Sequence, residues 1–228
     1  MGRLAFLGAF VWAQLSSPKN FIGLSLGAFA PTGSTQAKRR LYPTDGYAQP
    51  GFNIGVHLHA FIAPYVGLNL HVAQTFFSLE ASALGKDDRL FPNAVLLSKT
   101  PTISHTQLGF GVGTGFQVDW MALYIPLQLA MGLYAAPVME GQKDRNEIWV
   151  QPKFSAFQLG LSTGLMANFA ITERFFAGIS LRFTSMRSGE KEFVRSLYDR
   201  GVEERRFVYR ERVAVDGVEF GALVGIFL

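Results

Sequence analysis

Residues Phe52–Ile62, with the sequence FNIGVHLHAFI, decide the fold of this chain. Successive side chains of a β-strand point to opposite faces. One face carries Phe52, Ile54, Val56, Leu58, Ala60 and Ile62, and the other carries Asn53, Gly55, His57 and His59. Because the polar face also carries the smallest residue, there is little room on that side. The pattern is typical of a transmembrane barrel, with lipid outside and a narrow polar lumen inside.

The same alternation recurs in eight stretches, and their sixteen glycines all fall on the polar face. The stretches are residues 20–30, 51–62, 66–79, 104–116, 121–134, 154–170, 175–186 and 215–228. A period of two over such lengths indicates strands that separate two environments. We therefore predict an all-β fold, an eight-stranded antiparallel up-and-down transmembrane β-barrel.

The composition agrees with a membrane barrel. The chain has 228 residues, enough for one domain, and hydrophobic residues make up 49% of it. Polar residues interrupt the apolar stretches, so no segment has the ~20 apolar residues of a spanning helix. A closed barrel is then the remaining way to pair every backbone group in lipid. The chain has no cysteine, which excludes a disulfide framework and a thiol nucleophile.

Residues 1–13 have the order of an export signal. Arg3 supplies a positive charge, residues 4–12 are apolar, and Ala13 is a small residue before the expected cleavage point. We therefore expect a signal peptide at 1–13 and a barrel domain at 14–228. The alternative is a first strand that begins early.

The connections between the stretches alternate in length. Residues 63–65, 117–120 and 171–174 are short, whereas 31–50, 80–103, 135–153 and 187–214 are long and polar. Short periplasmic turns and long external loops are the rule for such barrels. Only Arg182, Asp216 and Glu219 are charged residues inside the stretches. This scarcity is expected, because a Lys or Arg facing lipid at mid-membrane costs about 2–4 kcal/mol.

The inward positions predict a polar network in the lumen. Its members are Arg182, Glu219, His57, His59, His71, Asn53, Asn69, Gln128 and Gln158. Arg182 and Glu219 lie on neighbouring strands at similar heights, which predicts a buried pair, because an unpaired charge would be costly there. We interpret this pair as a structural plug, and the alternative is a proton-sensitive gate.

The lumen histidines have a spacing that could bind a metal, because His57 and His59 share a strand face and His71 lies on the next strand. No carboxylate of the strands lies near them, so we expect no metal site and no cofactor. We also expect no catalytic residue. Phe183 stands where a lipid A deacylase needs a histidine, and a hydroxyl without a base is a poor nucleophile. The acidic pairs of omptin proteases and the His, Asp and Ser set of lipid A palmitoyltransferases are not found either.

The long loops carry clusters of charge. Residues 187–212 hold eight basic and six acidic side chains, and Tyr198–Gly201 is a predicted turn between two extended arms. Barrel closure brings this hairpin beside the first loop. The sequence predicts a basic outer rim made of Lys38, Arg39, Arg40, Arg205 and Arg206. We interpret it as a solvated surface of mixed charge, and the alternative is a specific site that contacts lipopolysaccharide phosphates.

Three segments resemble those of known outer-membrane barrels. They are Leu123–Leu127 (LYIPL), the Gly-x-Gly strand Gly109–Gly115 and the terminal Gly225–Leu228 (GIFL). Over residues 20–228 the chain resembles the small OmpX- and OmpA-like eight-stranded barrels, and more closely the PorT-like barrels of Bacteroidota. The resemblance is one of architecture and implies no active-site signature. The terminal strand departs from the usual assembly signal, because Phe227 is followed by Leu228.

These observations predict a non-enzymatic integral barrel in the outer membrane of a Gram-negative bacterium. Its expected role is structural or interactive: surface contact, lipopolysaccharide packing or membership of an outer-membrane assembly. Expected partners are outer-membrane lipid and lipopolysaccharide, the barrel-assembly machinery during biogenesis and a protein of an outer-membrane complex, but no nucleic acid. A narrow channel for small solutes or ions is the alternative. A soluble lipocalin-like binder would need an apolar interior, the reverse of this pattern.

Overall fold

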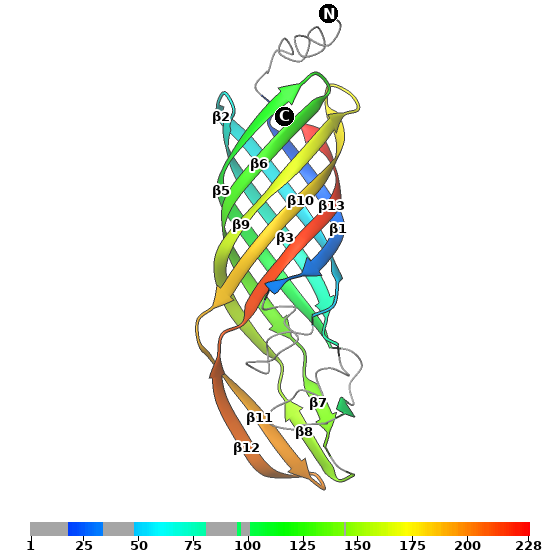
Figure 1. Ribbon diagram of the computed structural model, residues 1–228, viewed down its shortest axis with the longest axis vertical. Helices are drawn as coiled ribbons and strands as arrows, with labels where there is room; N and C mark the ends of the chain where they lie inside the picture. The colour runs from blue at the N-terminus through cyan, green and yellow to red at the C-terminus, as the bar shows by residue number, and fades with distance from the viewer. Residues whose placement is uncertain (1–17, 34–47, 81–94, 97–100, 144) are drawn as a thin grey trace, which may run out of the picture.

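The protein forms one closed barrel and a second, smaller sheet (Figure 1). The computed structural model describes residues 18–33, 48–80, 95–96, 101–143 and 145–228. In this part of the chain, no helix has the length and apolar character needed to span a membrane. The barrel strands, in spatial order, are β1 (Phe21–Pro31), β13 (Ala214–Phe227), β10 (Phe175–Ser188), β9 (Phe154–Ala170), β6 (Met121–Ala136), β5 (Thr102–Val118), β3 (Val66–Ser78) and β2 (Gly51–Ala63).

Every barrel strand pairs antiparallel with both neighbours, and β1 closes the barrel against β13. This arrangement confirms the predicted eight-stranded antiparallel barrel. The observed strand ends lie within two residues of the predicted ones. The agreement follows from the alternation itself, because each strand must keep one side in lipid and the other in the lumen.

The apolar face of the barrel points outward, as predicted. Leu161 is 56% exposed and Leu129 is 70% exposed, whereas His57 is buried inside. Soluble monomers rarely expose continuous apolar surface on this scale. The exterior therefore requires hydrocarbon around it, and the barrel is a transmembrane barrel.

The two ends of the barrel differ. We call the end with the three short connections the turn end, and the end from which the long connections leave the loop end (Figure 1). Tyr65 (φ 69°) and Asp119 (φ 49°) adopt left-handed backbone conformations in two of the short turns. The C-terminus lies at the turn end, as an even number of strands requires (Figure 1).

A five-stranded sheet, the outer sheet, lies beyond the loop end (Figure 1). Its strands, in spatial order, are β12 (Val202–Glu211), β11 (Lys191–Asp199), β8 (Glu147–Gln151), β7 (Met139–Gln142) and β4 (Val95–Leu96). The predicted hairpin in residues 187–212 is confirmed as β11 and β12. Arg200 (φ 47°) and Gly201 (φ 84°) are the two central residues of its turn, and positive φ at both is the geometry of a type I′ hairpin.

The β7–β8 hairpin corrects the sequence interpretation, which treated residues 135–153 as a polar loop. Met139 and Trp149 face inward from these short strands and are buried. They pack on Phe193 and Leu197 of β11. Burial against β11 therefore stabilises two strands that are too short to be recognised by periodicity alone.

Candidate functional site

The lumen of the barrel holds a polar layer between two apolar ones. All nine residues of the predicted network are buried, with exposed fractions of 5% or less. They come from β2, β3, β6, β9, β10 and β13. The structure brings six of them into two connected groups, one around Arg182 and one around Glu219.

Arg182 is the centre of the larger group. Its Nη1 atom donates to His71 Nδ1 at 2.6 Å and to Gln128 Oε1 at 2.7 Å. Nη2 lies 3.2 Å from His57 Nδ1, and Nη1 lies 3.4 Å from Ser162 Oγ. A single side chain on β10 thus bonds to strands on both sides of the lumen.

Glycines on β5 leave space opposite this guanidinium. A Cβ atom at Gly109 would lie 2.7 Å from Gln128 Oε1, the acceptor for Arg182. At Gly111 it would lie 2.7 Å from the Cα atom of the same residue. The predicted Gly-x-Gly strand is therefore needed for close approach of β5 to the network.

The hydrogen bonds define the form of the two stacked histidines. His57 and His71 are direct cross-strand partners, with ring centroids 4.4 Å apart. A guanidinium can only donate, so the Nδ1 atoms of both rings accept from Arg182. His57 then carries its proton on Nε2, which donates to Ser25 Oγ at 2.9 Å.

This tautomer decides what the Ser25–His57 contact can do chemically. A serine nucleophile needs a histidine nitrogen that accepts its proton, usually with a carboxylate on the other ring nitrogen. Here the nitrogen that faces Ser25 is the donor, and a guanidinium occupies the carboxylate position. The pair therefore serves as a hydrogen-bonded link between β1 and β2.

Glu219 belongs to a smaller group. Its Oε2 atom accepts from Asn53 Nδ2 at 2.7 Å. The register confirms that Arg182 and Glu219 are cross-strand partners. Yet among the described side chains Arg182 donates to the two histidines, Gln128 and Ser162, and makes no direct ion pair with Glu219. The lumen thus holds two opposite charges close together, each with its own neutral partners.

The other predicted lumen residues lie apart from these groups. Gln158 is near the loop end, where its Nε2 donates to the Val213 carbonyl at 3.0 Å. His59 lies toward the turn end, stacked on Phe61 with ring centroids 5.1 Å apart. The ring nitrogens of His59 and the side-chain amide of Asn69 have no hydrogen-bond partner among the described residues. Such buried polar atoms typically bind internal water.

An apolar cluster fills the lumen on each side of the polar layer. The turn-end cluster consists of Phe21, Ala122, Tyr124, Met166, Phe176 and Leu223, with Phe61 and Phe227 packed on it. The loop-end cluster includes Phe29, Phe77, Ile103 and Tyr134 of the barrel and continues into the outer sheet through Trp149 and Phe193. Both clusters place large side chains across the lumen.

The predicted basic rim is described only in part. Lys38, Arg39 and Arg40 lie outside the described residues, as does the expected signal peptide at 1–13. Arg205 and Arg206 lie on β12, in the half of that strand nearer the Tyr198–Gly201 turn. They therefore belong to the outer sheet and not to the barrel wall.

The described residues contain no group of three or more His, Asp or Glu side chains that could hold a metal ion. The three predicted histidines are divided instead, with His57 and His71 on Arg182 and His59 among aromatic rings.

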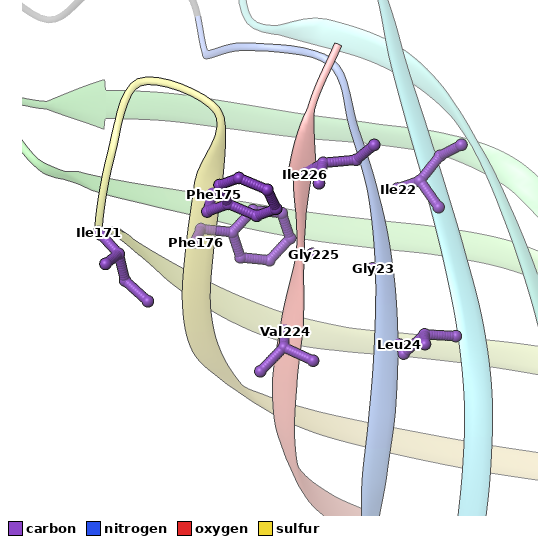
Figure 2. Close-up of a pocket in the computed structure, with 9 residues that line it drawn as sticks. All are labelled: Ile22, Gly23, Leu24, Ile171, Phe175, Phe176, Val224, Gly225 and Ile226. Carbon is purple, nitrogen blue, oxygen red and sulfur yellow. The ribbon is translucent and has the colours of Figure 1, made fainter.

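A groove of about 540 Å³ lies on the lipid-facing surface near the turn end (Figure 2). Ile22 and Leu24 of β1 flank it on one side, and Val224 and Ile226 of β13 lie beside them. Figure 2 shows Phe175 and Phe176 of β10 extending toward Gly225, Phe175 on the outer face of β10. Its lining is almost wholly apolar, as the membrane-facing wall requires.

The closed sheet, the apolar exterior and the filled polar lumen define an eight-stranded antiparallel transmembrane β-barrel. No model of a known protein family matches the sequence, and no curated protein is similar to it. Similar solved structures include Ail, the attachment invasion locus protein of Yersinia pestis, with 13% identity, a TM-score of 0.42, and coverage of 92% of this chain and 100% of Ail.

Two further similar solved structures are a surface protein and an outer membrane protein. Neisserial surface protein A has 13% identity and a TM-score of 0.45, with 91% of this chain and 97% of that protein covered. The outer membrane protein OprG from Pseudomonas aeruginosa has 11% identity and a TM-score of 0.45, with 92% and 97% covered.

Proposed function

We propose that the protein is a non-enzymatic outer-membrane anchor that presents the outer sheet for contact with a protein partner. The carrying observation is that β12, a ten-residue strand, is the outermost strand at one end of that sheet among the described residues. A free edge offers backbone N–H and C=O groups on which an extended segment of a partner can add a strand. The barrel then holds this edge at a set position above the membrane.

The shape of the molecule supports an outer-membrane orientation with the loop end outside. Short turns face the periplasm and long loops face the exterior in barrels of this class. The proposed location is the outer membrane of a Gram-negative bacterium, where lipopolysaccharide and the barrel-assembly machinery are the proposed partners of the barrel wall. The closer likeness to PorT-like barrels is part of the same proposal.

The character of β12 fits specific contact. Val202 is 71% exposed and Val208 is 55% exposed, so apolar side chains are available beside the edge. Three glutamates and three arginines on the same strand balance in charge. Charged side chains on an edge strand oppose unspecific pairing between sheets. A partner must therefore match both the backbone edge and this charge pattern.

The two apolar clusters support a closed lumen over the alternative of a narrow channel. Phe21, Tyr124 and Phe176 lie within one cluster, and the loop-end cluster lies on the other side of the polar layer. An eight-stranded barrel is only wide enough for side chains to fill it. Solutes would have to displace both layers.

Site-specific photo-crosslinking in native membranes tests the contact function. A photoreactive residue at Val208 should form a protein adduct, whereas the same residue at lipid-facing Leu161 should not. Liposomes that contain the purified barrel should not swell in arabinose. Adducts at neither position, or swelling at a porin-like rate, would contradict the proposal.

A further inference from the structure

A second groove crosses the outer surface of the barrel close to the loop end. Its volume is about 500 Å³. Its apolar part contains Leu127, Leu161 and Phe183, and its polar part contains Ser185, Arg187 and Asp216. We call it the rim groove. It differs from the groove in Figure 2, which has no charged group in its lining.

The apolar part of the rim groove is formed by a small outward residue between larger ones. Thr163 on β9 is the cross-strand partner of Leu127 on β6 and of Phe183 on β10. Its hydroxyl donates to the Pro126 carbonyl at 2.9 Å and is thereby satisfied in the apolar wall. The result is a shallow apolar groove along the outer wall, which suits a hydrocarbon chain.

A charged pair faces outward at the loop-side end of the same groove. Arg187 Nη1 donates to Asp216 Oδ1 at 2.5 Å, and Nη2 donates to Oδ2 at 2.8 Å. Nη1 also donates to the Met186 carbonyl at 2.8 Å, and Ser185 Oγ donates to Asp216 Oδ1 at 2.8 Å. The outward residues of β10 change from Phe183 to Ser185 and Arg187 at this level, which marks the edge of the apolar wall.

The two charges are not equally accessible. The side chain of Asp216 is 12% exposed and that of Arg187 is 47% exposed. Gly33 (φ 55°) comes so close to the carboxylate that a Cβ atom there would lie 3.0 Å from Asp216 Oδ2. The carboxylate is thus covered and holds the guanidinium in one orientation, while the positive group faces the surroundings.

The orientation of Arg187 leaves one edge of its guanidinium available. Arginine has five N–H donors in a planar fork. Asp216 engages the Nη1–Nη2 edge, and the Met186 carbonyl accepts from the other N–H of Nη1. The Nε–H and the outer Nη2–H form the second edge, and they donate to no described residue. Such an edge matches a phosphate, which accepts two parallel hydrogen bonds from arginine.

We propose that the rim groove binds a phosphorylated glycolipid of the outer leaflet. One acyl chain lies along Leu127, Leu161 and Phe183, and a phosphate accepts from the free edge of Arg187. The apolar part of the groove and the fixed Arg187 guanidinium together favour an anionic amphiphile. We choose the glycolipid because it forms the membrane leaflet that surrounds the loop end. That last point rests on the orientation given under Proposed function.

Lipid binding to the full chain, folded in detergent micelles, tests the proposal by native mass spectrometry. The probes are lipid A with two phosphates, the same lipid A without phosphates, and phosphatidylglycerol. We expect Arg187→Gln to raise the apparent Kd for diphosphoryl lipid A about tenfold, which corresponds to about 1.4 kcal/mol. Thr163→Leu, which fills the groove and keeps the charge, should act in the same direction.

Two matched variants serve as controls. Arg206→Gln removes an arginine from the outer sheet, and Ala222→Leu enlarges an outward residue on β13 away from the groove. Both should leave the Kd within about twofold, because neither touches the site. The shift of the folded band in unheated gel electrophoresis verifies that each variant is folded.

Three results would overturn the proposal. They are an unchanged Kd for Arg187→Gln, equal binding of dephosphorylated lipid A, and equal binding of phosphatidylglycerol. The contact function has a separate measurement, which is the Val208 crosslink in the Arg187→Gln variant. If lipid binding is unaffected and the crosslink persists, the rim groove is refuted and the contact function stands.

Discussion

Replacing Arg182 by methionine should strongly destabilise the barrel without making it conduct. Methionine has a similar length and adapts to irregular space, so the main change is the loss of the guanidinium. His57, His71 and Gln128 each lose their donor. Glu219 stays in the lumen with only Asn53 as hydrogen-bond partner.

The size of the effect follows from these contacts. Removing one member of a buried charged network typically costs about 3–5 kcal/mol. We expect a loss within this range, because three acceptors and one opposite charge are left behind. Changing Glu219 to glutamine as well removes the second charge. The double variant should then be less destabilised than the sum of the single ones, by about 0.5–3 kcal/mol.

Equilibrium urea unfolding in liposomes, followed by tryptophan fluorescence, measures these free energies. Arg210→Met is the matched control, because the Arg210 side chain is 74% exposed on the outer sheet. Its effect should stay within about 0.5 kcal/mol. Planar bilayers with the Arg182 variant should show no new current, because both apolar clusters remain. A stability equal to that of the natural chain, or a steady current, would refute the structural role of Arg182.

Three further substitutions test the barrel wall and its seals. Leu161→Arg should lower the free energy of unfolding by about 2–4 kcal/mol in lipid. Val208→Arg, at an almost equal exposed fraction, should lower it by less than about 0.5 kcal/mol because its site is in water. Equal unfolding free energies of the two variants would argue against a lipid-facing wall. Gly111→Ala should lower the free energy of unfolding by about 1–3 kcal/mol, because its Cβ meets the β6 backbone. Gly189→Ala is the control, because its Cβ has open space. Equal urea midpoints of the two variants would contradict this prediction. Phe176→Ala should cost about 3–5 kcal/mol without current in planar bilayers, and a current would show that the turn-end cluster alone seals the lumen.

The barrel could be predicted closely because one physical requirement acts along its whole wall. Lipid on one side and a crowded lumen on the other leave a visible period of two, so the strand bounds and the inward positions of His57 and Arg182 followed from the residues. Arg182 and Glu219, which we expected at similar heights, are cross-strand partners. The direction of the guanidinium was not accessible, because it depends on space across the lumen that glycines of β5 provide.

Two other features were missed for local reasons. The sequence interpretation ended the seventh strand at residue 186, so Arg187 was assigned to a loop and its pairing with Asp216 was not expected. The observed β10 continues to Ser188. The β7–β8 hairpin has strands of four and five residues in an aqueous setting. Its signal is limited to buried residues such as Met139 and Trp149, which become meaningful only when β11 is placed beside them.

The β11–β12 hairpin begins and ends on two adjacent barrel strands, β10 and β13, and the Ser188 amide binds the Val213 carbonyl where they meet. A pull on the tip of the hairpin is therefore transmitted along the axes of both strands at once. The ladders to β9 and β1 would be loaded in shear, so that many hydrogen bonds resist together and none is peeled open singly. A partner that pulled on the β11–β12 hairpin would therefore load a mechanically stiff attachment.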